Sequence, residues 1–130
     1  MKKYIKVVGA VILNNNKVLC AQRSESMSLP LLWEFPGGKL EQDESPEEAL
    51  IRELKEEMNC SIEILEKVTT TVHEYDFATI ELTTYYATIT SGSIQLSEHA
   101  QIKWLNRSDL LSLNWAPADI PAVEIIKNVY

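Results

Sequence analysis

The chain has 130 residues, of which 45% are hydrophobic and 24% are charged, and its formal net charge is -7. This length predicts one domain, residues 1–130, with enough core to fold without a disulfide or a structural metal. The acidic excess argues against binding of long nucleic acid through its phosphates, and no apolar run reaches the ~18 residues of a membrane span. Cys20 and Cys60 lack CxxC spacing, which is typical of a reducing compartment, so we expect a cytoplasmic protein.

The first part of the chain predicts a β-hairpin followed by a loop. Residues 5–13 are rich in Val and Ile and predict a strand, and residues 17–22 predict the returning strand. The three asparagines between them favour a turn, because Asn tolerates positive φ. Residues 23–32 are polar and interrupted by a proline, which predicts a loop, and Pro36-Gly37-Gly38 predicts a turn.

The clearest predicted helix begins after Ser45. The sequence Ser45-Pro46-Glu47-Glu48 places serine at the N-cap, proline at the first helical position and glutamate at the third, which is a capping box. The helix should run to about Met58. Asn59 can then take the left-handed conformation that ends many helices.

The second half of the chain predicts strands and a closing helix. Residues 62–74 and 79–90 predict two long strands, and residues 101–105 predict a short one. Ser108 should cap a short helix that runs through residue 113, and residues 120–129 predict a terminal helix. Strands, a helix, more strands and a final helix indicate the α+β class, with helices packed on the faces of a sheet.

Three glutamates of the first predicted helix form an acidic stripe. At about 100° per residue, Glu53, Glu56 and Glu57 lie on one side of the helix, beside an apolar stripe that can pack on a sheet. Like charges at these spacings repel, whereas an all-oxygen cluster suits Mg²⁺ or Mn²⁺. A solvated acidic face is the alternative. Glu44 and Gly38, just before the helix, favour the metal site, because glycine lets backbone carbonyls approach an ion closely.

The spacing of these residues resembles the Nudix box, G-x5-E-x7-R-E-U-x-E-E-x-G-U, in which U is aliphatic. The matching residues are Gly38, Glu44, Arg52, Glu53, Leu54, Glu56 and Glu57. Two positions depart from the pattern, with Asn59 in place of the final glycine and Cys60 in place of the final aliphatic residue. We expect the loop to tolerate both, since Asn is the best non-glycine residue at a left-handed site and Cys is a small hydrophobe.

Two further segments extend the resemblance. Residues 33–39, Trp-Glu-Phe-Pro-Gly-Gly-Lys, are similar to the segment before the box in MutT-type nucleoside triphosphate pyrophosphohydrolases. Residues 116–121, Ala-Pro-Ala-Asp-Ile-Pro, resemble the C-terminal segment of a bacterial MutT-like subgroup that hydrolyses CTP and modified dNTPs. The resemblance implies a Nudix fold, a mixed β-sheet packed between helices. It also implies hydrolysis of a nucleoside triphosphate to a monophosphate and pyrophosphate.

The resemblance also implies roles for the charged residues. In this chemistry Mg²⁺, which Mn²⁺ can replace, neutralises developing charge, and a carboxylate takes a proton from water. The implied metal ligands are the Gly38 carbonyl, Glu53, Glu56 and Glu57. Arg52 would orient the carboxylates, and Glu44 would be a water-mediated ligand or a structural acceptor. Glu98, shortly before the strand at 101–105, is a further candidate ligand or base, or else a surface carboxylate. We expect His73 and His99 to be structural.

The candidates for substrate binding lie in other segments. Arg23 and Lys39 are candidates for phosphate, with a surface ion pair as the alternative for Arg23. Phe35 and Ile80 are candidates for base stacking or pocket walls, and core packing is the alternative for both. Trp33 and Trp115 are weaker candidates, and we expect Trp104 in the core.

Asp119 is the candidate for base recognition. An ionised Asp only accepts hydrogen bonds, so it could pair with the exocyclic amine of cytosine or with two adjacent donors of guanine. The alternative is that Asp119 caps the terminal helix.

The sequence therefore predicts a metal-dependent pyrophosphohydrolase of free nucleoside triphosphates, with CTP or dCTP types favoured. We expect a monomer or homodimer that binds neither long nucleic acid nor a membrane. Three alternatives stay open: an 8-oxo-dGTP diphosphatase of nucleotide-pool sanitation, a hydrolase of sugar or dinucleotide diphosphates, and a non-catalytic nucleotide-sensing Nudix module. The intact set of glutamates argues against the last.

Overall fold

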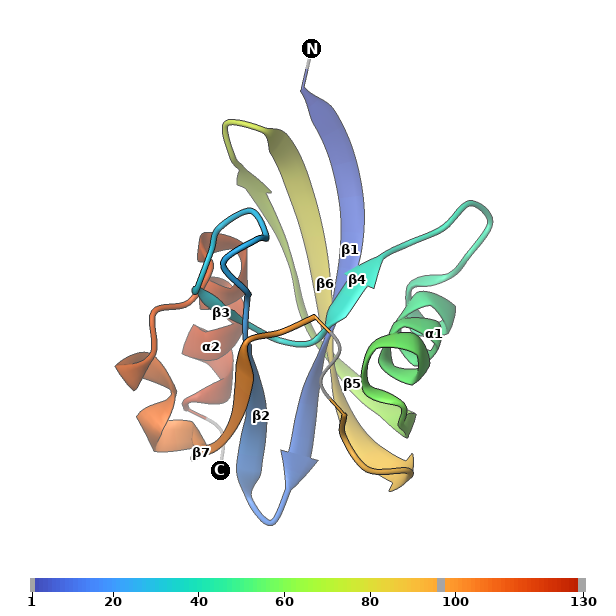
Figure 1. Cartoon of the computed structure of the whole chain (residues 1–130), viewed down its shortest axis with the longest axis vertical. Coiled ribbons are helices and arrows are strands. Elements are labelled where there is room, and N and C mark those ends of the chain that lie inside the picture. The colour runs from blue at the N-terminus through green and yellow to red at the C-terminus, as the bar shows by residue number, and fades with distance from the viewer. Residues whose placement is uncertain (1, 96–97, 129–130) are drawn as a thin grey trace.

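A mixed β-sheet forms the centre of the structure, with helices on both sides of it (Figure 1). The computed structural model describes residues 2–95 and 98–128. Its strands are β1 (Lys3–Asn14), β2 (Lys17–Gln22), β3 (Trp33–Glu34), β4 (Gly37–Lys39), β5 (Ser61–Glu74), β6 (Ala78–Ser91) and β7 (Gln101–Asn106). Its helices are α1 (Pro46–Met58), the 3₁₀ helices η1 (Arg107–Ser112) and η2 (Pro117–Asp119), and α2 (Ile120–Ile126).

The long strand β1 connects the two parts of the sheet. The strand order is β3-β2-β1-β6-β5, with β4 also paired to β1 and β7 to β2. β1 runs parallel to β6 from the pair Lys3↔Ala78 to the pair Ile12↔Ala87. Its far end turns into β2 as the predicted hairpin, with Asn15 (φ 52°) and Asn16 (φ 66°) in the left-handed region.

The predicted helix is confirmed at both ends. Ser45 accepts from the Glu48 backbone N–H, and the Glu48 carboxylate accepts from the Ser45 N–H, which completes the capping box. Asn59 adopts φ 54° and ψ 39°, and its backbone N–H reaches the carbonyls of Leu54 and Lys55. Leu50, Leu54 and Met58 of α1 are buried, so its apolar stripe lies on the sheet.

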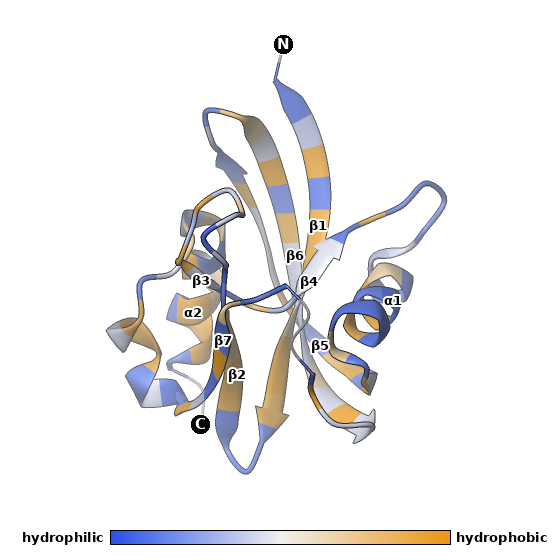
Figure 2. Cartoon of the chain, viewed as in Figure 1, coloured by the Kyte–Doolittle hydropathy of each residue, from blue (hydrophilic) through white to orange (hydrophobic). Residues whose placement is uncertain are grey.

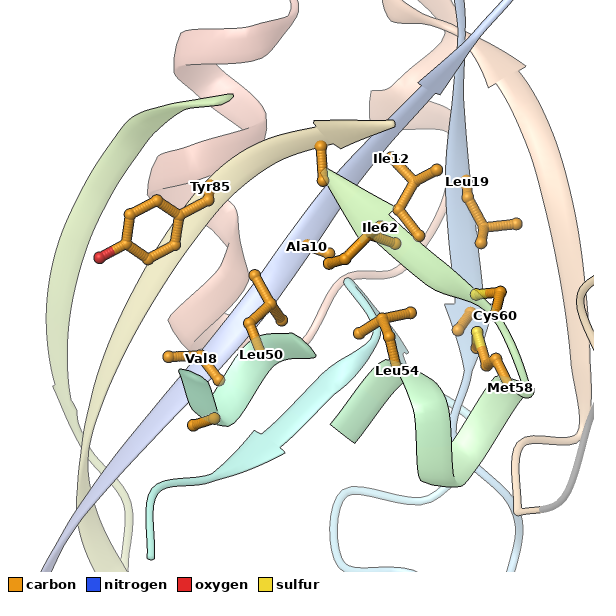
Figure 3. Close-up of a cluster of buried hydrophobic side chains, with 13 residues drawn as sticks. Val8, Ala10, Ile12, Leu19, Leu50, Leu54, Met58, Cys60, Ile62 and Tyr85 are labelled. Atoms are coloured by element: carbon orange, nitrogen blue, oxygen red, sulfur yellow. The ribbon is translucent and has the colours of Figure 1, made fainter. Parts of the chain in front are cut away.

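Two apolar clusters hold the helices on the two faces of the sheet. One cluster joins α1 to the sheet and includes Ala10, Ile12, Leu54 and Tyr85 (Figure 3). The other includes Val11 of β1 and Val123 of α2. Neighbouring residues of β1 thus enter opposite clusters, as the two-residue period of a strand requires. Figure 2 shows the apolar residues concentrated along the middle of the strands.

The expected turn at Pro36-Gly37-Gly38 is wrong, because both glycines belong to β4. Gly37 and Gly38 pair with Gly9 and Val8 of β1. Neither has a positive φ. A Cβ at Gly37 would overlap the Val8 carbonyl, and a Cβ at Gly38 would overlap the Glu53 carboxylate. The glycines are therefore needed for close approach within the fold and not for a reversal of the chain.

Two predicted element ends also need correction. Ser108 does not cap a helix, because η1 starts one residue earlier and its N-cap, Asn106, makes no side-chain cap bond. The terminal helix α2 ends at Ile126, three residues before the predicted end at residue 129, which lies outside the described residues. Within residues 2–95 and 98–128, no helix is long and apolar enough to cross a membrane.

Candidate active site

A cavity of about 780 Å³ lies where β3, β4, α1 and η2 meet. Most of the residues that the sequence singles out line it, although they come from distant parts of the chain. They are Arg23, Phe35, Gly38, Lys39, Arg52, Glu53, Glu57, Ile80, Glu98 and Asp119. Glu44 and Glu56 lie outside the lining.

Carboxylates gather at one end of this cavity. Glu53, whose side chain is 14% exposed, lies against the backbone of Gly38. Glu57 is one turn further along α1 and is half-buried. Burial, then the hydrogen bond and the charge of Glu53, and then the charges of Glu98 and Glu34, raise the pKa of Glu57 to about 8. Burial and the neighbouring carboxylates therefore disfavour the ionised form of Glu57.

Arg52 connects the acidic stripe to the segments before the helix. Its Nε and Nη2 donate to the two carboxylate oxygens of Glu44 at 2.7 and 3.0 Å, and Nη2 also donates to the Lys39 carbonyl at 3.0 Å. Its Nη1 donates to Glu53 at 3.1 Å and to Glu56 at 2.9 Å. These bonds, with that from the Glu41 backbone N–H, hold the pKa of Glu44 below its ordinary value. Glu44 thus acts as a structural acceptor in this structure.

Glu56 differs from the other two glutamates of the stripe. Its side chain is 61% exposed and is held by Arg52 outside the cavity lining. The helical period accounts for the difference, since Glu57 lies about 40° from Glu53 whereas Glu56 lies about 100° from Glu57. The stripe therefore presents Glu53 and Glu57 to the cavity and Glu56 to its rim.

The donor chemistry of the acidic end fits a hard divalent cation. In the described part of the chain, no three His, Cys, Asp or Glu side chains converge closely enough to hold a metal ion as they stand. Glu53, Glu57 and Glu98 nevertheless line one cavity with the Gly38 backbone, and they supply only oxygen donors. A cation would offset both the burial and the neighbouring negative charges that raise the pKa of Glu57.

Arg23 and two partners form a second polar group in the cavity wall. Its Nη1 donates to Glu34 Oε1 at 2.7 Å, and its Nε donates to the Ser28 carbonyl at 2.6 Å. The other oxygen of Glu34 lies 2.8 Å from His99 Nε2. Sequence reasoning missed Glu34, although it lies within the segment that resembles MutT-type enzymes. Arg23 thus has the ion-pair partner of the alternative interpretation while it also faces the cavity.

Asp119 also lines the cavity and is almost completely buried. Its side chain is not a helix cap, since it makes no capping bond although it occupies the N-cap position of α2. Its Oδ1 accepts instead from the Phe35 backbone N–H at 3.1 Å. Burial, followed by the negative charge of Glu34, raises the pKa of Asp119 well above its ordinary value.

The aromatic candidates divide between cavity and core. Phe35 lines the cavity but is only 3% exposed, and its ring packs 4.8 Å from that of Trp115. Trp33 and Trp115 are buried in the cluster beneath α2, and Trp104 packs against the cluster beneath α1, as predicted for the core. Ile80 is partly buried and lines the cavity.

Tyr75 and Phe77 are cavity residues that the sequence analysis did not select. Their rings stack 5.2 Å apart, and the Tyr75 hydroxyl accepts from the Ala118 N–H at 2.8 Å. Both lie at the connection of β5 and β6 and line the cavity near Asp119. The signal available in the sequence was a pair of aromatic residues close to the turn between two predicted strands.

Comparisons with known proteins identify the family of the chain. The NUDIX domain family model matches residues 3–124. The CTP pyrophosphohydrolase of Escherichia coli (strain K12) is 38% identical over 122 residues, which cover 94% of this chain and 90% of that protein. The 8-oxo-dGTP diphosphatase of Proteus vulgaris is 37% identical over 98 residues, which cover 75% of this chain and 86% of that protein.

Solved structures show the same similarity. The solution structure of a protein described as DNA mismatch repair protein MutT, of the Nudix hydrolase family, from methicillin-resistant Staphylococcus aureus 252 is 58% identical, with a TM-score of 0.81 and 98% of each chain covered. The chain belongs to the Nudix family, and it is a Nudix hydrolase, an enzyme that acts on acid anhydrides. The α+β fold expected from the sequence is confirmed. Nudix hydrolases generally depend on a divalent metal ion.

Proposed function

We propose that this protein hydrolyses free cytoplasmic nucleoside triphosphates to a nucleoside monophosphate and pyrophosphate, with Mg²⁺ or Mn²⁺ as cofactor. One observation carries the proposal. A single cavity is lined by carboxylates from α1 and the segment before β7, which form its acidic end, and also by a buried carboxylate beside a backbone N–H, which we take as its base end. The first group suits a metal-bound polyphosphate, and the second suits the polar edge of a base.

The acidic end supplies the residues for metal binding and proton transfer. The Gly38 carbonyl, Glu53, Glu57 and Glu98 would hold the metal, with Glu56 completing the set from the rim. The ion would neutralise charge that develops on the phosphoryl oxygens. Arg52 keeps Glu53 and Glu56 in place through the hydrogen bonds of its Nη1. A carboxylate oxygen of this end takes the proton of the attacking water.

Cations at the wall of the cavity would bind the phosphates. Arg23 uses Nε, Nη1 and Nη2 on Ser28 and Glu34, and five N–H groups give it two donors beyond those three bonds. Lys39 is exposed and follows the two glycines of β4. Both cations lie in the cavity lining together with the carboxylates that they would complement.

The base end favours a substrate of the CTP or dCTP type. Asp119 offers an acceptor next to the Phe35 backbone, and an acceptor there can receive the exocyclic amine of cytosine. Ile80 and the ring of Phe35 would contact the faces of the base. The raised pKa of Asp119 favours the second candidate, 8-oxo-dGTP, because a protonated carboxyl can also donate to a purine acceptor.

A substrate panel tests this assignment. Pyrophosphate release should be measured with Mg²⁺ for CTP, dCTP, 5-methyl-dCTP, dGTP and 8-oxo-dGTP, with ADP-ribose included as a diphosphate substrate. The proposal expects triphosphates to be cleaved and the cytosine nucleotides to give the highest kcat/KM. A preference for ADP-ribose over every triphosphate would contradict it, and a clear preference for 8-oxo-dGTP would establish the second candidate.

A further inference from the structure

Three side chains form a hydrogen-bonded chain across the cavity wall, and the proposed function leaves two of them without a role. Glu34 is the middle member, with Arg23 Nη1 2.7 Å from one oxygen and His99 Nε2 2.8 Å from the other. A carboxylate in its ionised form only accepts, so this bond to Glu34 is made by the form of His99 that carries a proton on Nε2. The side chains of His99 and Glu34 are 4% and 20% exposed, so little water competes for this bond.

His99 is well placed to fix its neighbour Glu98. Glu98 is exposed, and its side chain makes no hydrogen bond within residues 2–95 and 98–128. On one side, the Gln95 N–H binds the Met58 carbonyl at 3.1 Å, and on the other the Ala100 N–H binds the Gln22 carbonyl at 2.8 Å. His99 lies between these two backbone hydrogen bonds in the sequence. Its side-chain bond to Glu34 is therefore the fixed contact next to Glu98.

We propose that Glu34 and His99 are a positioning pair that holds Glu98 at the acidic end of the cavity. Glu34 also binds Arg23. The same carboxylate therefore helps to position both Glu98 and a phosphate-binding cation. The inference rests on the proposed function, since Glu98 matters to turnover only if the acidic end binds the metal. Residues that orient a metal ligand typically contribute 10- to 100-fold to affinity or activity.

Two substitutions of His99 separate its hydrogen bond from its bulk. His99→Leu removes the donor, whereas His99→Gln places an amide N–H near the position of Nε2. Gln101→Leu is the matched control, because it removes the bond from Gln101 Nε2 to Gln22 Oε1 (2.8 Å) in the next stretch of chain without touching Glu34. The Kd for Mn²⁺, from the EPR signal of the free ion, is measured alongside kcat and KM for CTP.

The pair predicts a defined pattern. His99→Leu should weaken Mn²⁺ binding and lower kcat by about 10- to 100-fold, with KM changed less than about threefold. His99→Gln should recover most of both losses, and Gln101→Leu should resemble the unmodified protein. If His99 had only a structural role, both His99 variants would instead have a lower Tm, and kcat would not change more than KM. If His99→Leu does not fold, Glu34→Gln is measured in its place. This variant should also weaken Mn²⁺ binding and lower kcat.

A double-mutant cycle with Glu98→Gln decides whether His99 acts through Glu98. Once Glu98→Gln has removed the charge, His99→Leu should cause little further loss of kcat or Mn²⁺ affinity. Equal losses in both backgrounds, or normal Mn²⁺ binding by His99→Leu, would overturn the inference. If the unmodified protein cleaves no triphosphate, the proposed function fails, and the Mn²⁺ titrations still report on the pair.

Discussion

Glu57 lies half-buried beside Glu53. Its negative charge therefore lowers the stability of the fold, whereas in the proposed function it helps to hold the metal ion. The substitution Glu57→Gln keeps the shape of the side chain and removes the charge. We expect kcat to fall roughly a hundredfold or more, the scale of losing a key electrostatic group. Tm should stay or rise, because like-charge repulsion is relieved. Assays at saturating Mg²⁺ and a thermal scan check both, with the exposed Glu63→Gln of β5 as control. Near-normal turnover would exclude Glu57 from the reaction centre.

Asp119 should set the choice of base and leave the chemistry largely alone. A buried acceptor left unpaired costs about 1–3 kcal/mol, so a mismatched base should be disfavoured by roughly ten- to a hundredfold. Asp119→Ala should flatten the preference among bases, and Asp119→Asn should shift it toward bases that present an acceptor. The measurement is kcat/KM for CTP, 5-methyl-dCTP, dGTP and 8-oxo-dGTP in the three proteins. An unchanged ranking would place base recognition elsewhere.

Single residues also show where sequence reasoning reached its limit. Asp119 had two open interpretations, and a bond to Phe35, 84 positions away in the chain, decided against the helix cap. Glu34 and His99 are 65 positions apart and were not connected by any local pattern. Local spacing predicts which residues share a helix face, whereas pairs of this kind follow only from the assembled sheet.

At the scale of elements, β4 and α1 depend on each other through Gly38. A Cβ at this position would overlap the Glu53 carboxylate, so Gly38→Ala must displace Glu53 or move the strand. We expect about 1–3 kcal/mol of lost stability, as for overpacking, and at least about a tenfold higher Mg²⁺ requirement. Urea unfolding and Mg²⁺ titration of activity measure the two effects.

Gly9→Ala provides the matched control on the neighbouring strand. A Cβ at Gly9 would meet its nearest atoms, in Phe35, Thr84 and Leu82, at 3.4 to 3.5 Å, which is ordinary contact. This variant should keep its Mg²⁺ requirement. Equal behaviour of the two variants would show that the contact between Gly38 and Glu53 has no special importance.

The elements differ in how far the sequence predicts them. α1 is predicted at both ends because its signals are local, namely a capping box at Ser45 and a left-handed residue at Asn59. β4 resembles a turn in the sequence because its glycines serve contacts with β1 and Glu53, which are distant in the chain. The acidic stripe follows from the helical period, whereas the bond that holds Glu56 to Arg52 at the rim of the cavity is visible only in the structure.

At the scale of the whole molecule, Asp119 should make stability depend on pH. Its pKa is raised on folding, so between its unfolded value of about 3.9 and its higher folded value the native state binds more protons. The free energy of unfolding therefore falls as pH rises through this window. Asp119→Asn keeps an acceptor for the Phe35 N–H and carries no charge. Its stability relative to the unmodified protein should increase in urea titrations as the pH is raised above about 4, and a difference that does not change with pH would contradict this.

The most direct test of the account is the product balance of the whole reaction. The protein is incubated with CTP and Mg²⁺, or with CTP and EDTA, and the products are quantified by ³¹P NMR. The account predicts equal amounts of CMP and pyrophosphate with Mg²⁺, and no turnover in EDTA. Inorganic phosphate as the sole product, or full turnover in EDTA, would contradict the assignment of this cavity as a metal-dependent pyrophosphohydrolase site.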